Sequence, residues 1–290
     1  AMTRMEIPGL LGAGMLVALS GFLGAGGCGN SEDASGFSSP RESGGASPGE
    51  ANGASSGSSG AGGTSGAAPE KEVESDFEAP VATGTVVWVA NPKSGRVALV
   101  DAVSLQVRTV EAGNGPTYLA SVPAQPVDTT LVLNVLSEDA TLLRATPQGI
   151  TTATFKTAKL ANSLAFSSDG RFAIAWADAR QVPTAPRTEG FQDLAVLDLV
   201  SGTSTILAVG YRPVAVGFAE GTPRAYAVTQ DGVLVIDLTG EPRVTNNVPI
   251  SDTPNEDPGT RDVFVTRDGR RAFIRRDGSS VITVVSLEGA

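Results

Sequence analysis

Few side chains in this sequence are equipped for chemistry, and most of those are carboxylates, amides and guanidinium groups. The chain has 290 residues, no histidine and a single cysteine. Without histidine, Ser-His-Asp triads, Cys-His pairs and HExxH zinc sites are excluded within this chain. One cysteine likewise excludes an internal disulfide and a CxxC pair. We therefore expect no catalytic residue, no metal and no cofactor.

Five polar residues recur at a nearly constant spacing, each at the end of a short apolar run. They are Asn91, Asn134, Asp178, Asp231 and Asp277, and successive members are 43, 44, 53 and 46 residues apart. Asn and Asp at such positions ordinarily cap hairpin turns through local hydrogen bonds. The alternative is a column of ligand-binding side chains on one face of a repeat. We keep these five residues as candidates for a binding face.

Two long irregular segments carry further charged candidates. Residues 179–192 contain Arg180 and Arg187, and residues 249–260 contain Asp252, Glu256 and Asp257. Loops on a rigid scaffold are where binding residues concentrate, so all five join the candidate binding face. The acidic group lacks the DxDxDG order of a calcium loop. We interpret it as solvated loop charge rather than a metal site.

The segments between these residues are typical of short strands. From about Gly84 onward, runs of five to seven Val, Leu, Ile and Thr residues are separated by Gly, Pro, Asp and Asn, with no sustained helical period. Four such runs fill each unit of about 45 residues. A unit that is apolar on both faces must stack on its neighbours. The pattern predicts an all-β fold, a β-propeller of four-stranded antiparallel blades with about five blade repeats, the last one incomplete.

Two stretches of this repeat resemble a known family. The segments "VVWVANPKSGRVALVDAVSLQV" at 86–107 and "LAFSSDGRFAIAWAD" at 164–178 resemble the YVTN-type β-propeller repeat, a relative of the quinoprotein-dehydrogenase-like propellers. The resemblance covers residues 84–290 and implies the propeller fold. It implies no catalytic residues, because propellers host binding, scaffolding and several enzyme activities on one architecture.

Strand positions follow from the repeat, with strands labelled A to D from the axis outward. We place A strands at 117–122, 163–167, 213–218 and 261–265, while the first unit shows no clear A strand and the last stops after strand C. We expect a truncated copy of a larger propeller, the alternative being a five-bladed ring closed by strands from both ends. Trp88 and Trp176 lie in B strands, where we expect them in the core. Antiparallel alternation puts the B-to-C turns and the D-to-A connections on one face, the candidate binding face.

The N-terminus has the form of an export signal. Arg4 precedes the apolar and small residues 7–27, which end directly before Cys28. The triplet at 25–27 followed by cysteine resembles the bacterial lipoprotein box, although Ala25 stands where leucine is usual. We predict a signal peptide over residues 1–27 and lipidation of Cys28. The alternatives are a free thiol beside an ordinary cleavage site and an uncleaved membrane anchor.

The composition after the cysteine is that of a tether. Residues 29–70 include 11 Gly and 11 Ser, with Phe37 the only large hydrophobic residue. Such a segment cannot bury enough apolar surface to offset its ordering entropy. We predict a lipidated Cys28 with a disordered, acidic Gly/Ser-rich linker over residues 28–83 and a β-propeller domain over 84–290.

The charge balance limits the partners. A formal net charge of −10 and an isoelectric point of about 4.6, with no Lys/Arg cluster, argue against a nucleic-acid surface. We expect a non-enzymatic binding or scaffolding lipoprotein, exported across the inner membrane and held at the outer membrane or cell surface by its lipid. Its expected partners are the membrane and a protein or glycan on the loop face. The alternatives are a fragment of a lactonase-like or quinoprotein-dehydrogenase-like propeller enzyme and a purely structural envelope protein.

Overall fold

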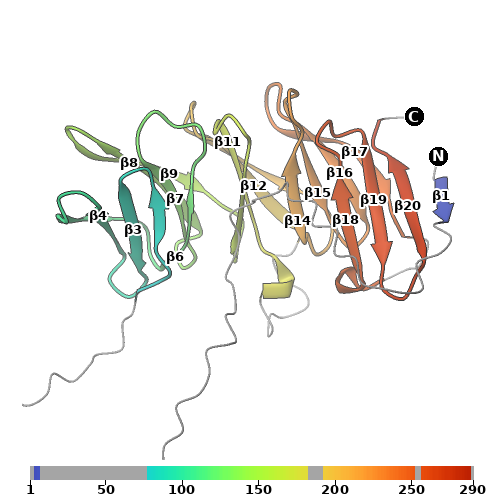
Figure 1. The fold of residues 1–290 in the computed structure, drawn as a ribbon, viewed down its shortest axis with the longest axis horizontal. Helices are drawn as coiled ribbons and strands as arrows, with labels where there is room; N and C mark the ends of the chain where they lie inside the picture. The colour runs from blue at the N-terminus through green and yellow to red at the C-terminus, as the bar shows by residue number, and fades with distance from the viewer. Residues whose placement is uncertain (1–2, 7–76, 182–191, 252–255, 289–290) are drawn as a thin grey trace, which may run out of the picture. The chain divides into compact units, whose positions relative to one another are not determined.

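The computed structural model describes residues 3–6, 77–181, 192–251 and 256–288, and these ranges are built of strands, turns and two short 3-10 helices (Figure 1). The strands are β1 (Thr3–Glu6), β2 (Val81–Thr83), β3 (Val86–Asn91), β4 (Arg96–Asp101), β5 (Val107–Glu111), β6 (Pro116–Ser121), β7 (Thr129–Asn134), β8 (Asp139–Thr146), β9 (Gly149–Lys156), β10 (Ser163–Phe166), β11 (Phe172–Trp176), β12 (Asp193–Asp198), β13 (Thr203–Ala208), β14 (Ala215–Phe218), β15 (Arg224–Val228), β16 (Gly232–Asp237), β17 (Arg243–Pro249), β18 (Arg261–Val265), β19 (Arg271–Arg276) and β20 (Val281–Ser286). The helices are η1 (Ala179–Gln181) and η2 (Pro258–Thr260).

The strands form five antiparallel sheets, which we call blades 1 to 5. Blades 1 to 4 are the consecutive strands β2–β5, β6–β9, β10–β13 and β14–β17, each paired in chain order. Blade 5 has the order β1-β20-β19-β18, so three of its strands are consecutive and the fourth comes from the N-terminus. Antiparallel neighbours in chain order need only short hairpin connections. The predicted all-β fold of four-stranded, propeller-type blades is confirmed.

Each blade buries apolar side chains against the next one along the chain. Four separate clusters of buried residues occur, one for each pair of consecutive blades. Between blades 1 and 2, for example, Trp88 and Leu99 pack with Val132 and Leu143. Strand β7, which lies in a blade with a neighbour on both sides, is buried at all six positions. Stacking therefore provides the burial that a single four-stranded sheet lacks.

Both tryptophans belong to this core, as predicted. Trp88 is fully buried, and its indole Nε1 donates a hydrogen bond to Thr83 Oγ1 at 2.8 Å. Trp176 is 7% exposed and packs in the cluster between blades 3 and 4. The rings fill space between sheets, so neither is available as a platform for stacking a ligand.

Blade 1 has an A strand that the sequence did not reveal. Strand β2 is only three residues long and pairs with β3 in the register Val81 to Trp88 and Thr83 to Val86. A run of three residues is too short to show an alternating pattern. It lies just before residue 84, where we had placed the start of the domain. The expectation that the first unit lacks strand A is thus corrected.

The fourth strand of blade 5 comes from the opposite end of the chain, as in the alternative in which strands from both ends complete a blade. Strand β1 pairs antiparallel with β20, from Thr3 opposite Val284 to Glu6 opposite Val281. Residues 84–290 contribute three strands to this blade, as predicted. Strand β1 lies within residues 1–27, which the sequence analysis interprets as a signal peptide.

Candidate functional site

The connections that carry the predicted binding residues share one face of the blades, which we call the loop face. Its described parts are the D-to-A connections 112–115, 157–162, 209–214, 250–251 and 256–260 and the B-to-C turns 92–95, 135–138, 177–181, 192, 229–231 and 277–280. The two kinds of connection touch directly. Leu136 N donates to Asn114 O at 3.1 Å, and Gln230 N donates to Tyr211 O at 3.0 Å. The arrangement predicted from antiparallel alternation is present.

The first two members of the Asn/Asp column have local structural roles. Asn91 Oδ1 accepts a hydrogen bond from Ser94 N at 3.0 Å, which caps the hairpin turn. Asn134 is buried, and its Nδ2 donates to Asp139 Oδ1 at 2.6 Å and to Thr141 Oγ1 at 2.9 Å. Its own Oδ1 has no partner among the described residues. Both amides therefore stabilise turns within a blade.

The third member, Asp178, ties blade 3 to blade 4. Its main chain exchanges two hydrogen bonds with the buried Asn162 side chain, at 2.7 and 3.1 Å. Its buried carboxylate accepts from Arg180 Nη2 at 2.8 Å and Nε at 3.0 Å. Arg180 Nη2 also donates to Val214 O, at the start of blade 4. The hydrogen bonds that Arg180 donates to the Asp178 carboxylate raise the pKa of Arg180, so this guanidinium stays charged.

A second charged group joins blades 4 and 5. Glu256 Oε1 accepts from Arg276 Nε at 2.7 Å, and Glu256 Oε2 accepts from Arg261 Nη1. The Arg261 side chain is 1% exposed, and its Nη2 donates to Thr229 O and Gln230 O at 3.0 and 2.6 Å, in the B-to-C turn of blade 4. We call Glu256, Arg261 and Arg276 the blade-5 clamp.

The clamp determines the ionisation of its carboxylate. Burial raises the pKa of Glu256, but hydrogen bonds from Arg276, Ser251 and Arg261 outweigh burial and lower it to about 2. Arg276 Nη2 also donates to Ile250 O at 2.6 Å, at the start of the connection that contains Glu256. Both ends of residues 250–260 are therefore held by charged hydrogen bonds, which are roughly twice as strong as neutral ones.

The remaining candidates do not converge with these groups. Asp231 is exposed, and Asp277 is exposed with its carboxylate 3.3 Å from Arg275 Nη2. Asp257 Oδ1 accepts from Gly259 N at 2.9 Å, which caps helix η2, and lies 4.0 Å from Arg212 Nη1. The other three candidates, Arg187, Asp252 and Cys28, lie outside the described residues.

The sequence analysis missed the cationic half of the blade-5 clamp. Arg261 and Arg276 sit at the start of β18 and the end of β19, in the register that places them directly opposite each other. A signal was present in "TRDVF" and "FIRRD", where arginine interrupts an apolar strand. An arginine in a strand that packs against the next blade needs hydrogen-bond acceptors. A buried charge is costly unless it is paired and hydrogen-bonded.

The described residues hold no group of three or more His, Cys, Asp or Glu side chains spaced for a metal ion. Within the same ranges, no helix is long and apolar enough to cross a membrane. The buried charges described on the loop face are bonded to one another and to main-chain carbonyls, except that Arg261 Nε has no partner among the described residues.

No protein-family model and no curated protein matches the sequence. Two solved structures resemble the chain in fold. Hydrazine synthase of Kuenenia stuttgartiensis matches with a TM-score of 0.46 and 18% identity, covering 77% of this chain and 67% of that one. The Pan2 WD40 domain of Neurospora crassa matches with a TM-score of 0.39 and 15% identity, covering 74% and 63%. The chain thus spans about two thirds of the length of each.

Similarity at this level carries no information on function. The pairing of strands in chain order and the burial of one apolar cluster between each pair of consecutive blades are the stronger evidence. On that evidence the chain is an all-β repeat protein of the β-propeller class.

Proposed function

We propose that this protein is a cell-envelope lipoprotein that displays its β-propeller as a non-enzymatic module for binding or scaffolding. The N-terminal pattern supports the anchor, because Arg4, the apolar residues 7–27 and Cys28 follow the order of a lipoprotein signal. The Gly/Ser-rich residues 29–70 would separate the lipid from the blades. In this proposal the chain crosses the inner membrane and is held at the outer membrane or cell surface by lipid on Cys28.

The observation that carries the binding role is the use of charge on the loop face. Asp178 with Arg180, and Glu256 with Arg261, are bonded to each other and to carbonyl groups of the adjacent blade. Charges used in this way hold connections in place, whereas an enzyme site needs polar groups directed at a shared reacting atom. The pattern supports a platform that presents a surface to a protein or a glycan.

Within the β-propeller class, we place the chain with the YVTN-type repeat proteins. The support is the repeat phrase at 86–107 and 164–178, where a strand, a hairpin ending in Asn or Asp and a second strand follow one another. That architecture hosts many activities, so the functional proposal depends on the loop face and not on the repeat.

Processing at Cys28 has a consequence for blade 5. Cleavage before Cys28 would remove strand β1, which pairs with β20. In the mature lipoprotein β20 would then be the outer strand of a three-stranded blade, with unpaired main-chain groups along one edge. Mature and unprocessed protein should differ at this strand.

The anchor is tested by labelling cells that express the full chain with an alkyne-modified palmitate. We expect label on the wild-type protein and none on Cys28→Ser, with Ser31→Cys in the Cys28→Ser background as a control for thiol content. The mass of the purified protein should correspond to a chain that begins at Cys28. Unlabelled wild-type protein that retains residues 1–27 would contradict the proposal.

The binding role is tested by crosslinking the full chain in intact envelopes and comparing three forms. In the first variant Arg187 and Asp252 are both replaced by alanine. In the control, Glu241→Ala removes an exposed charge from the opposite face. We expect at least one partner that the wild type and Glu241→Ala capture equally and the double variant captures at least tenfold less. Identical capture by all three forms would overturn the role of the loop face.

A further inference from the structure

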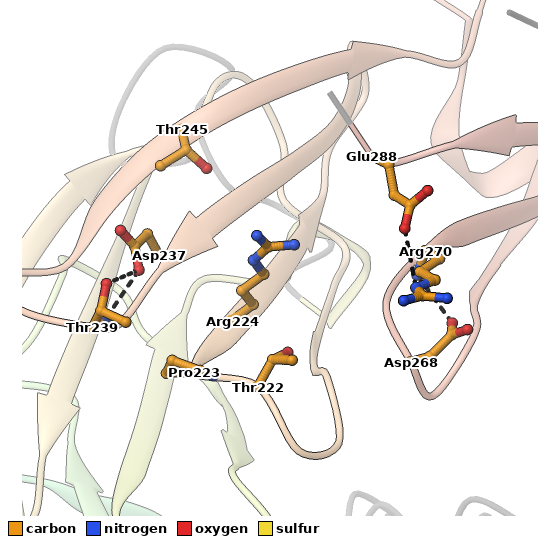
Figure 2. A pocket seen from close by; sticks show the side chains of 9 residues that line it. All are labelled: Thr222, Pro223, Arg224, Asp237, Thr239, Thr245, Asp268, Arg270 and Glu288. Atoms are coloured by element: carbon orange, nitrogen blue, oxygen red, sulfur yellow. Dashed lines mark hydrogen bonds and ion pairs between the residues drawn. The ribbon is translucent and has the colours of Figure 1, made fainter. Parts of the chain in front are cut away.

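The connections on the opposite side of the blades, which we call the turn face, enclose a cavity between blades 4 and 5. The turn face consists of the A-to-B and C-to-D turns. The cavity has a volume of about 630 Å³ and is lined by Thr222, Pro223, Arg224, Asp237, Thr239, Thr245, Asp268, Arg270 and Glu288 (Figure 2). That volume lies within the range of small-molecule sites, roughly 300–1,000 Å³.

Most of the charged groups in this cavity are already paired. Asp237 Oδ1 accepts from Thr239 N at 3.0 Å, and Asp237 Oδ2 accepts from Arg243 Nη2 at 2.7 Å. Asp268 Oδ1 accepts from Arg270 N at 3.0 Å, and Arg270 Nε lies 3.0 Å from Glu288 Oε1. These pairs hold the carboxylates on the two sides of the cavity, and Figure 2 shows the contacts of Asp237 with Thr239 and of Arg270 with Asp268 and Glu288.

Arg224 is the exception. In Figure 2 its guanidinium lies between the Asp237 side of the cavity and the Arg270–Glu288 side. Among the described residues it makes no salt bridge, although its charge lies near enough to Asp237 to lower the pKa of that carboxyl and also acts on the Tyr226 hydroxyl. A planar guanidinium with free donors is the group that binds a carboxylate through two parallel hydrogen bonds.

The repeat itself provides a comparison for Arg224. In blade 3, Arg171 precedes strand B and its Nη2 lies 3.0 Å from Oδ2 of Asp198, the last residue of strand C. In blade 4, Arg224 begins strand B and stands directly opposite Asp237, the last residue of strand C. The register differs by one residue, since Phe172 and not Arg171 stands opposite Asp198, and in blade 4 Asp237 Oδ2 is bonded to Arg243. Arg243 thus leaves Arg224 available.

We propose that this cavity binds a small hydroxylated carboxylic acid, with Arg224 holding the carboxylate. Two arginines and three carboxylates line the cavity, and Arg243 beside it pairs with Asp237, so a monoanion meets less repulsion here than a dianion does. Asp268 Oδ2 and Glu288 Oε2 bear no hydrogen bond within the described part of the chain and can accept from ligand hydroxyls. A uronic acid has both features. The site is independent of the lipid anchor and of the loop face.

The test is a titration of the full chain with sodium D-glucuronate at constant ionic strength, followed by calorimetry. Two control compounds are titrated in parallel. D-Glucose lacks the carboxylate, and inorganic phosphate lacks the sugar hydroxyl groups. We expect saturable binding of glucuronate and at least tenfold weaker binding of both others. No saturation by glucuronate, or equal binding of glucose or phosphate, would overturn the proposal.

Variants locate the binding to Arg224. We expect Arg224→Gln to raise the dissociation constant for glucuronate at least tenfold. Arg224→Lys should raise it severalfold, because lysine keeps the charge but cannot donate two parallel hydrogen bonds. Arg243→Gln should also weaken binding, since it releases Asp237 to pair with Arg224. Arg171→Gln, the corresponding arginine of blade 3, should change it less than twofold. Equal effects of Arg224→Gln and Arg171→Gln would refute the site, and unchanged circular dichroism shows that each variant is folded.

Discussion

The two faces of the blades use charged residues differently. On the turn face, Asp101 and Asp237 each end a strand C and accept hydrogen bonds from residues two or three further along the chain. On the loop face, Arg180 and Arg261 reach carbonyl groups of the adjacent blade. These two carboxylates of the turn face therefore close single hairpins, whereas Arg180 and Arg261 connect neighbouring blades. The turn face also has contacts between blades, from Arg144 Nη2 to Leu199 O and from Thr85 Oγ1 to Asp128 Oδ2.

The difference is also visible in ionisation. The pKa of Asp101 is lowered by the N–H groups of Ser104 and Val103, and the pKa of Asp237 by the hydroxyl and N–H of Thr239, all within the same turn. The pKa of Glu256 is lowered by side chains from two strands of blade 5. Local hydrogen bonds survive the separation of blades, whereas the bonds from Arg261 to Thr229 O and Gln230 O of blade 4 do not. Charge on the loop face should therefore contribute most to cooperative stability.

The largest expected effect is the loss of the blade-5 clamp. Arg261→Ala leaves Glu256 with Arg276 and Ser251 and removes the donor from two carbonyl groups of blade 4. We expect a loss of about 3–5 kcal/mol in the free energy of unfolding, measured in urea. The exposed pair Arg275–Asp262 is the control, and Arg275→Ala should cost less than about 1 kcal/mol. If Arg261→Ala and Arg275→Ala lower the free energy of unfolding by similar amounts, the buried clamp stabilises the fold no more than an exposed ion pair does.

A glycine of the turn face tests close packing between blades. Gly269 has φ of +68°, and a Cβ there would lie 1.8 Å from the Tyr226 hydroxyl of blade 4. Gly278 has φ of +71° but open space around a Cβ. Gly278→Ala should cost about 1–2 kcal/mol for the backbone alone, and Gly269→Ala should cost about 2 kcal/mol more for the clash. Equal losses in thermal unfolding would show that blades 4 and 5 are not in contact here.

Acid should weaken the clamp in a defined direction. The pKa of Glu256 is about 2 in the folded protein, below its ordinary 4.5. A lowered carboxyl pKa stabilises the fold above the unfolded value and loses that contribution as pH falls through the folded value. The stability difference between wild type and Glu256→Gln should therefore be largest at pH 6 and shrink from pH 4.5 toward 2. If the stability difference between wild type and Glu256→Gln stays constant over this pH range, ionised Glu256 does not stabilise the fold.

The smallest expected effect is on the turn face. Asp198 Oδ1 accepts from Val200 N and Ser201 N, both at 3.0 Å. Asp198→Ala should cost about 1 kcal/mol, as for other capping side chains. Asp231→Ala, on an exposed carboxylate of the loop face, should change stability by less than about 0.5 kcal/mol. The two losses are compared from the urea midpoints of unfolding. A larger loss for Asp231→Ala than for Asp198→Ala would mean that the Asp231 carboxylate makes a stabilising contact.

The repeat made the strands and the local turns predictable. Each hairpin is short, so Asp169 and Asp268 could be placed in A-to-B turns from "SDGR" and "RDGR" alone, and both accept from a main-chain N–H two residues on. The Asn/Asp column was recognised for the same reason, and Asn91 is the hairpin cap that its position suggests.

The contacts between blades could not be predicted in the same way. Arg180 and Val214 are 34 residues apart, and Arg261 and Thr229 are 32 apart, so their meeting depends on how blades stack. Strand β2 was missed because three residues show no period, and the β1–β20 pairing because the two strands lie at opposite ends of the sequence. The cavity at Arg224 requires knowing that Asp237 pairs with Arg243, a choice that residue types alone do not determine.

Hydrogen exchange measured by mass spectrometry on Arg261→Ala and Asp198→Ala tests the division between the two faces most directly. We predict that Arg261→Ala, in blade 5, increases exchange in the blade 4 segment 226–236 as well as in its own strands. Asp198→Ala should increase exchange only within its own blade, residues 163–208, which includes its partner Arg171. If Arg261→Ala leaves blade 4 unchanged, or Asp198→Ala spreads to blades 2 and 4, the loop face does not connect the blades.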